Sequence, residues 1–405
     1  MTDHRPASDT KMLLSVVLAG AVLLLVVHSL GRFIYTPLLP YLVADGMLTA
    51  TEGASVATWN YLGYLIGALL AIRWYRPDQI RLALPVAMGV HVITTLAQTQ
   101  VDSTSLLAGM RLVNGVANGV VFVQAPALIL EWLVRRNRSG ASGLVYVGVG
   151  AGLLVSSLLV SGTADMLSGP ARWWPAALLS IPLALWATWR LVRLDVPARI
   201  QRDDGSFAEK GPLLDRASIP LFLSYAGAGL GYILPMTFLP LLTQTQLPEG
   251  HWLVDGSWLL LAVATIPTPI IWSFLGSRFG DRSALQLNYL IQFLGALAVV
   301  IWPDPLGITL CALLVGSTFV GTVLLTQRLG RALHPHQGPR LSAAMVALYG
   351  ATQMAGPWLT RQWLEAGGTL VGAFTIGAVA LGWGLLFAFF VPRPERWHSR
   401  SRAQG

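Results

Sequence analysis

The chain has 405 residues, of which 54% are hydrophobic and only 11% are charged, and its mean hydropathy is +0.60. Soluble domains carry about 25% charged residues, so this composition excludes an ordinary soluble protein and predicts a lipid-facing one. The net charge of +8 could suggest a nucleic-acid partner, but the basic residues lie in short loops between apolar runs, so we expect no nucleic-acid binding. The single cysteine, Cys311, can form no intrachain disulfide.

Apolar runs of about 20 residues, each long enough to cross a bilayer as a helix, recur along the chain. The third and ninth runs are interrupted by His91 and Gln292. The pattern predicts an all-α polytopic membrane protein with twelve transmembrane helices near residues 13–41, 53–72, 80–98, 104–130, 141–163, 172–192, 217–242, 254–275, 284–302, 306–327, 341–361 and 369–391.

The positive charges predict how these helices are oriented. If the N-terminus is cytoplasmic, all but four of the 27 Lys and Arg residues fall in inner segments; Arg172 and Arg361 lie outside, and Arg32 and Arg111 lie within spans. Cytoplasmic loops of membrane proteins carry such an excess. We therefore expect a multi-pass protein of the bacterial inner membrane, with a retained first span and both termini in the cytoplasm.

Two ten-residue segments resemble each other at a spacing of 200 residues: GRFIYTPLLP over 31–40 and GYILPMTFLP over 231–240. A repeat of half the chain length is typical of transporters built from two similar bundles. The longest polar stretch lies between the sixth and seventh spans. We predict an N-terminal six-helix bundle over 1–193, a cytoplasmic linker over 194–216, a C-terminal six-helix bundle over 217–392 and a cytoplasmic tail over 393–405.

Four local motifs resemble the major facilitator superfamily (MFS), and within it the YbfB/YjiJ-like branch. This resemblance implies two pseudo-symmetric six-helix bundles around a central cavity, and transport by alternating access. The motifs are GRFIYTPLLP over 31–40, NYLGYLIG over 60–67, RLVNGVANG over 111–119 and GATQMAGP over 350–357.

The loops after the second and eighth spans depart from the superfamily. It usually has an Asp-Arg pair in each, but RWYRPDQIR over 73–81 has no aligned Asp, and Ser277 stands at that place in LGSRFGDR over 275–282. The salt bridges that the resemblance implies for closing the inner gate are therefore in question, with Asp78 and Asp281 as candidate substitutes.

The first span contains a buried cation. His28, Arg32 and Tyr35 follow each other at i, i+4 and i+7 and share one face of an α-helix. An arginine at a helix centre costs at least about 2.5–3.5 kcal/mol, so it must face water, a partner or a ligand. We predict that Arg32 and Tyr35 bind substrate and that His28, which titrates near neutrality, carries the proton. The alternative is that Arg32 reaches outward or binds carbonyls freed by Pro37.

The fourth span holds a second buried cation, Arg111, with Asn114 and Asn118 on the same face. The resemblance implies a role for this arginine in proton coupling or helix contacts. We place Arg111 in both the substrate site and the proton pathway, with a structural role across the bundle as the alternative. No Asp or Glu lies deep inside any predicted span, so two buried cations favour an anionic substrate.

Other polar residues pair at helical spacing and are candidates for the cavity wall. Interhelical hydrogen bonding, which contributes about 0.6–2 kcal/mol, is the alternative role for each of them. His91 is a second candidate proton carrier, with packing as its favoured role. The complete predicted substrate site is Arg32, Tyr35, Asn60, Tyr64, Arg111, Asn114, Tyr146, Tyr232, Tyr349 and Gln353.

The chain contains no HExxH motif, no P-loop and no cysteine cluster, so we expect neither an enzyme nor a cofactor or metal. The sequence predicts a monomeric secondary transporter that moves a small organic solute, preferably an anion, through the lipid bilayer with proton coupling. One alternative is a drug-type exporter of amphipathic compounds, although the two buried arginines argue against cationic substrates. The other is a membrane sensor, although the longest polar stretch is too short for a sizeable output domain.

Overall fold

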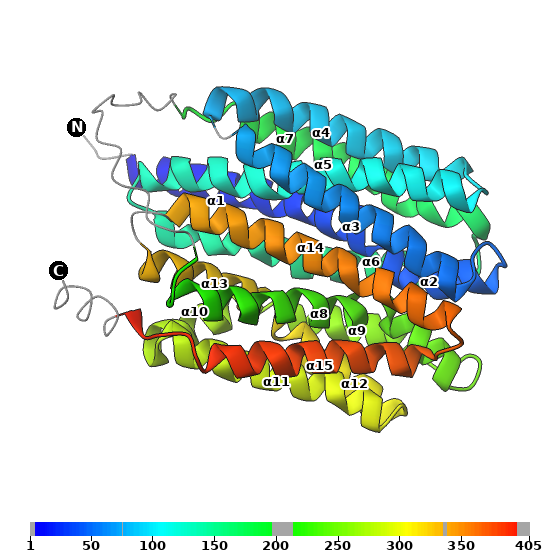
Figure 1. The fold of residues 1–405 in the computed structure, drawn as a ribbon. Coiled ribbons are helices and arrows are strands. Elements are labelled where there is room, and N and C mark those ends of the chain that lie inside the picture. Colours follow the sequence, from blue (N-terminus) through cyan, green and yellow to red (C-terminus); the bar gives the residue numbers. More distant parts are fainter. Residues whose placement is uncertain (1–4, 75, 197–213, 335–337, 395–405) are drawn as a thin grey trace.

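The computed structural model describes residues 5–394, except 75, 197–213 and 335–337. Within these ranges the regular structure is entirely helical (Figure 1). The elements are α1 (Arg5–Leu24), η1 (Leu25–Phe33), α2 (Tyr35–Ala44), α3 (Ala50–Arg73), α4 (Pro77–Ala97), η2 (Gln98–Gln100), α5 (Thr104–Val134), η3 (Ser139–Tyr146), α6 (Val147–Gly162), η4 (Gly169–Trp173), α7 (Trp174–Val192), α8 (Ser218–Gln246), α9 (Leu253–Thr265), α10 (Thr268–Phe279), α11 (Asp281–Ile301), α12 (Pro305–Gly316), α13 (Phe319–Leu333), α14 (Gly338–Glu365) and α15 (Leu370–Ala388).

Ten helical segments of the described chain are long and apolar enough to cross a membrane. The bent pair α9 and α10, which meet at 43° around Pro267, makes an eleventh span if it is counted as one. Helix α14 is long enough, at 28 residues, but polar residues such as Thr352, Gln353 and Thr360 interrupt its apolar sequence. The polytopic all-α class is therefore confirmed, whereas the count of twelve spans stays a prediction.

The first span is not the single α-helix that the apolar run predicted. It consists of α1, a π-helical segment η1 and α2, with a break at Ile34. Pro37 contributes to the break because it has no N–H to donate to the preceding turn. π-Helical turns are rare and are frequent at functional sites.

The helices of the two halves of the chain lie on opposite sides of the molecule in Figure 1, with α14 between α3 and α8. The start of α1 and the end of α15 lie at the same end of the bundle. Most of the predicted linker, 194–216, and of the predicted tail, 393–405, falls outside the described residues, so the domain boundaries stay predictions.

Helices α3 and α5 pack with their backbones in close contact. A Cβ atom at Gly63 or Gly67 would collide with the backbone of α5, and one at Gly115 or Gly119 would collide with the backbone of α3. Small residues allow such close approach in membranes, where lipid tails provide no hydrophobic force between helices. This contact fixes the tyrosines of α3 against the first span.

Candidate functional site

An arginine from another helix binds two backbone carbonyl groups of the π-helical segment η1. Arg111 of α5 donates from Nη1 to the carbonyl oxygen of Gly31 and from Nη2 to that of Arg32, the latter at 2.9 Å. Pro37 has no N–H to donate to the Arg32 carbonyl in a π-helix, and Arg111 supplies a donor to that carbonyl and to the one before it. The geometry is that of a structural role for Arg111, and it fixes the backbone from which Arg32 projects.

Arg32 links the two halves of the molecule. Its side chain is 1% exposed, and Nη2 donates to Oε1 of Gln353 on α14 at 2.5 Å. Nε2 of Gln353 in turn donates to the Tyr232 hydroxyl on α8 at 2.6 Å. Within the described ranges, Arg32 forms no ion pair, and its Nε and Nη1 have no hydrogen-bond partner.

Aromatic rings take the place of a counter-ion. The Arg32 guanidinium lies over the rings of Tyr64 and Tyr61, with its central carbon 4.2 and 4.4 Å from the two ring centroids, and 5.0 Å from that of Phe33. Cation–π contacts contribute about 0.5–2 kcal/mol each, more when desolvated. The hydroxyl groups of Tyr61 and Thr237 are 2.7 Å apart, which joins α3 to α8 beside the arginine.

The second half contributes a stack of parallel rings. Tyr232 stacks on Phe319 and on Tyr349, in each case with a centroid distance of 5.5 Å and an interplanar angle of 10°. Tyr349 stacks in turn on Tyr225 at 4.3 Å and 11°. The predicted residues Tyr232, Tyr349 and Gln353 are therefore brought together next to Arg32.

His28 packs against aromatic rings that also border the Arg32 site. Its ring stacks on Phe122 at 4.6 Å and meets the edge of Phe33 at 4.9 Å. Phe122 also contacts Tyr64 at 5.9 Å and Tyr146 at 6.1 Å. The structure thus connects the predicted residues His28, Tyr64 and Tyr146 through a phenylalanine that the sequence did not single out.

Four of the predicted residues make other contacts. The Tyr35 ring lies beneath the Arg111 guanidinium at 5.0 Å, and its hydroxyl donates to the carbonyl oxygen of Gly53 at 3.0 Å. Nδ2 of Asn60 donates to the Arg111 carbonyl oxygen at 2.7 Å, and Asn114 belongs to a separate polar group. That group also contains His91, Thr94, Thr95 and Asn118.

The polar group around His91 is a feature that the sequence did not predict. His91 Nδ1 lies 2.8 Å from Oδ1 of Asn118, and its ring packs against Gly31, where a Cβ atom would collide with it. The sequence signal that could have indicated this group is the i, i+4 spacing of Asn114 and Asn118, which places both on the face of α5 that contacts α4. This arrangement joins α4 and α5 to the π-helical segment.

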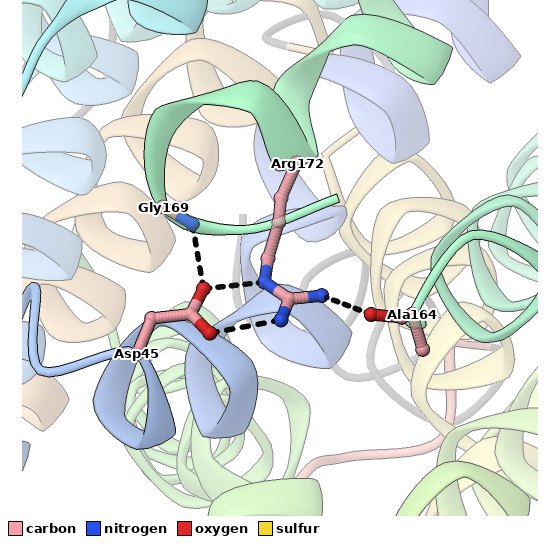
Figure 2. A network of polar contacts seen from close by, with 4 residues as sticks. All are labelled: Asp45, Ala164, Gly169 and Arg172. Atoms are coloured by element: carbon pink, nitrogen blue, oxygen red, sulfur yellow. Dashed lines mark hydrogen bonds and ion pairs between the residues drawn. The ribbon is translucent and has the colours of Figure 1, made fainter. Parts of the chain in front are cut away.

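At the α2 end of the first span, a bidentate ion pair joins the residue after α2 to η4 (Figure 2). Arg172 donates from Nε and Nη2 to the Asp45 carboxylate at 2.6 and 2.9 Å, and Nη1 binds the Ala164 carbonyl oxygen at 2.9 Å. The Gly169 N–H donates to the same carboxylate at 2.6 Å. The hydrogen bonds from Arg172 hold the pKa of Asp45 below its usual range.

Contacts between the two halves continue from Arg32 toward this end. The Thr36 hydroxyl donates to the carbonyl oxygen of Met236 at 2.5 Å, and the Tyr41 hydroxyl donates to the Asp255 carboxylate at 2.7 Å. The guanidinium of Arg172 lies over the Tyr41 ring at 4.7 Å, so this ion pair and the interface between the halves are in contact.

A groove that is open to the surface lies between the halves near the opposite end. It has a volume of about 330 Å³ and is lined by Gly140, Gly143 and Leu144 of the first half and by Pro269, Ile270, Ser273, Phe274, Ser277 and Leu324 of the second.

Two ion pairs at this end each lie within one half of the molecule. Arg328 binds Asp281 at 3.1 Å, and the exposed Arg76 binds Asp78 at 2.6 Å. Elsewhere in the described chain, no three His, Cys, Asp or Glu side chains gather as a metal ion would require.

Comparison with known proteins decides the family. The sequence matches the family described as "Uncharacterised MFS-type transporter YbfB" over residues 24–389. The chain belongs to this family. The major facilitator resemblance of its motifs is thereby confirmed, and the protein is a multi-pass membrane transporter rather than an enzyme.

Solved structures agree with this assignment of the fold. A crystal structure of a mutant of the nucleoside transporter NupG is 16% identical, has a TM-score of 0.68 and aligns 92% of this chain with 98% of its own. A second NupG structure is also 16% identical, with a TM-score of 0.66 and coverages of 93% and 97%. At this identity the likeness shows the MFS fold alone. A search of curated proteins gives no match.

Proposed function

We propose that this YbfB-family transporter moves small organic anions across the bacterial inner membrane by alternating access, coupled to protons. The observation that carries the proposal is Arg32. The Arg32 side chain lies between the two halves and is 1% exposed. Among the described residues it forms no ion pair, and its Nε and Nη1 have no hydrogen-bond partner. A buried uncompensated charge is costly, and a substrate anion would offset it.

The contacts between the halves support a closed outer side. Hydrogen bonds of Tyr61, Thr36, Tyr41 and Ser156 join the first half to the second on this side of Arg32. A surface groove lies between the halves near the other end. We infer that substrate reaches Arg32 from the inside in this arrangement. Separation of these outer contacts would give access from outside, as alternating access requires.

His28 is the proton carrier that we propose. It lies on the same π-helical segment as Arg32, among aromatic rings that include Tyr64, so the two cationic groups act on one site. Protonation of His28 beside Arg32 adds positive charge, which favours binding of an anion. We further propose that the protein works as a monomer of two six-helix bundles, 1–193 and 217–392, with both termini in the cytoplasm.

Uptake into proteoliposomes tests this function. Organic acids and their neutral amides would be compared with and without a pH gradient across the membrane. We expect the acids to be transported, the amides not, and the gradient to drive accumulation. Equal uptake of amides and acids would refute the anion preference, and accumulation that ignores the pH gradient would refute proton coupling.

Two variants separate the candidate proton carriers. His28→Gln should abolish the response to the pH gradient but leave counterflow exchange of substrate, because exchange needs no net proton movement. His91→Gln, a matched change in the polar group of α4 and α5, should keep the gradient response. The reverse pattern would assign the proton to His91.

A further inference from the structure

The groove between the halves changes from apolar to basic along both of its walls. One wall is η3, which leads from Leu144 back to Arg138, the residue directly before η3. The other wall is α10, which leads from Ile270 forward to Arg278. Because successive spans alternate in direction, η3 begins and α10 ends at the same end of the bundle. The two walls therefore become basic in the same direction, toward the end that we propose to be cytoplasmic.

The deep part of the groove is apolar and open. Leu144, Ile270 and Phe274 are 44%, 57% and 60% exposed although they belong to membrane spans. A Cβ atom at Gly140 or Gly143 would have no atom within 4 Å, so these glycines leave the space between η3 and α10 free. Apolar side chains that are exposed within a span contact lipid chains, which are as apolar as leucine.

The basic end of the groove carries two arginines whose charge is not neutralised. Arg138 and Arg278 are exposed, and neither forms an ion pair within the described part of the chain. Arg328 differs, because it pairs with Asp281 while it contacts Ser273 in the groove. Basic groups between spans at the cytoplasmic side bind the headgroups of anionic lipids.

We infer that an anionic phospholipid occupies this groove, with an acyl chain against Leu144, Ile270 and Phe274 and its phosphate between Arg138 and Arg278. The inference goes beyond the proposed transport and does not depend on the substrate. An acyl chain in the groove would hold η3 and α10 apart, so the lipid should favour the arrangement in which the halves are separated at this end.

Native mass spectrometry of the purified full-length protein tests the binding. The probes are dioleoylphosphatidylglycerol and dioleoylphosphatidylcholine in equal amounts, which share their chains and differ in headgroup charge. Each arginine near an anionic headgroup favours its binding about fivefold, so we expect phosphatidylglycerol to be bound at least about tenfold more. Equal binding of the two lipids would overturn the inference. Displacement of the lipid by soluble glycerol phosphate would also overturn it, because a free phosphate would then be the ligand.

Charge variants locate the headgroup. Arg138→Gln and Arg278→Gln should each lower the preference for phosphatidylglycerol about fivefold. Arg193→Gln removes an exposed arginine at the end of α7, a helix that packs on α1 and α4, and should keep the preference. If the control lost as much as the two variants, or if neither variant lost any, the preference would belong to the basic surface as a whole and this site would be refuted.

A variant that fills the groove locates the acyl chain. Gly143→Leu places a side chain in the open space and should lower the occupancy of both lipids by at least about fivefold. Gly89→Leu adds the same side chain at an open glycine on the exposed face of α4 and is the control. Unchanged lipid binding by Gly143→Leu would refute the position of the chain.

Cross-linking across the groove tests the effect on the two halves. Gly140→Cys and Ser277→Cys, in a Cys311→Ser background, put one cysteine on each wall. In nanodiscs of phosphatidylglycerol the two cysteines should form a disulfide about fivefold more slowly than in nanodiscs of phosphatidylcholine. Equal rates in the two lipids would show that the lipid does not hold the halves apart.

Discussion

The Thr36 hydroxyl donates a 2.5 Å hydrogen bond to the carbonyl oxygen of Met236, the residue at the same place in the second repeat. The repeat is therefore a contact as well as a similarity: its two copies meet between the halves of the molecule. The chemistry of the copies differs one turn earlier, where Arg32 stands opposite Tyr232 and the two side chains are bridged by Gln353.

Loss of the Thr36 hydroxyl should loosen the contact between the halves on the side that we propose to be the outer one. Thr36→Val keeps the shape and removes a hydrogen bond that contributes about 1 kcal/mol, so the outward-open population should rise about fivefold. Since Cys311 is the single cysteine, Leu241→Cys in a Cys311→Ser background gives a unique reporter one turn beyond Thr237 for a membrane-impermeant maleimide. Thr58→Val is the control, because the Thr58 hydroxyl binds within its own helix. Equal labelling of Thr36→Val and the control would contradict the role of the contact.

The ion pair between Arg172 and Asp45 should make stability depend on pH. The pKa of Asp45 is lowered by Arg172, so the pair stabilises the folded protein above the pKa of the unfolded carboxyl, about 4, and the stabilisation is lost as the pH falls through the lower folded value. Asp45→Asn should lose about 1–3 kcal/mol at pH 7 and show a flatter fall in thermal stability on acidification. Asp78→Asn, which removes an exposed pair, should change little. Identical acid profiles for Asp45→Asn and the wild type would refute this account.

Replacement of the amide at Gln353 should block the site without harming the fold. Gln353→Glu is nearly isosteric and puts a carboxylate on Arg32, which then has a permanent internal counter-ion. We expect the apparent melting temperature to stay equal or to rise and substrate affinity to fall at least about tenfold, measured by thermal shift and binding. Gln353→Met, which leaves Arg32 free, should retain more affinity than Gln353→Glu; the opposite order would show that Gln353 itself recognises the substrate.

Arg111 should prove structural. Lysine keeps the charge but cannot bind two carbonyl groups as a planar fork, so Arg111→Lys should leave the carbonyl of Gly31 or Arg32 without a donor. We expect a loss of stability of about 1–3 kcal/mol together with reduced transport. Full stability with transport lost would instead place Arg111 in the coupling step.

The sequence predicted the spans well because lipid exposure selects long apolar runs irrespective of tertiary contacts. It also singled out Arg32, Tyr232 and Gln353, each because it is polar at membrane depth. It could not pair them, since Arg32 and Gln353 are 321 residues apart and only the docking of the halves brings them together.

Tyr35 and Tyr61 lie where the helical spacings did not indicate, for two different physical reasons. The shared face of His28, Arg32 and Tyr35 assumes an α-helix, but η1 is a π-helix with more residues per turn, and Tyr35 lies beyond its end against Arg111. Tyr61 was not predicted because the i, i+4 pair of Asn60 and Tyr64 indicates a face of α3 next to the one that carries Tyr61. In the structure Arg32 lies over the i, i+3 pair, Tyr61 and Tyr64.

The most direct measurement is transport by Arg32→Gln in proteoliposomes. Arg361→Gln makes the same chemical change at an exposed position and is the control. If the Arg32 charge offsets that of the substrate, Arg32→Gln will fold and insert normally but lose organic-anion uptake by at least about a hundredfold, the loss expected for an unpaired buried anion, while Arg361→Gln transports like the wild type. Unchanged anion uptake by Arg32→Gln would remove Arg32 from the site and contradict the account.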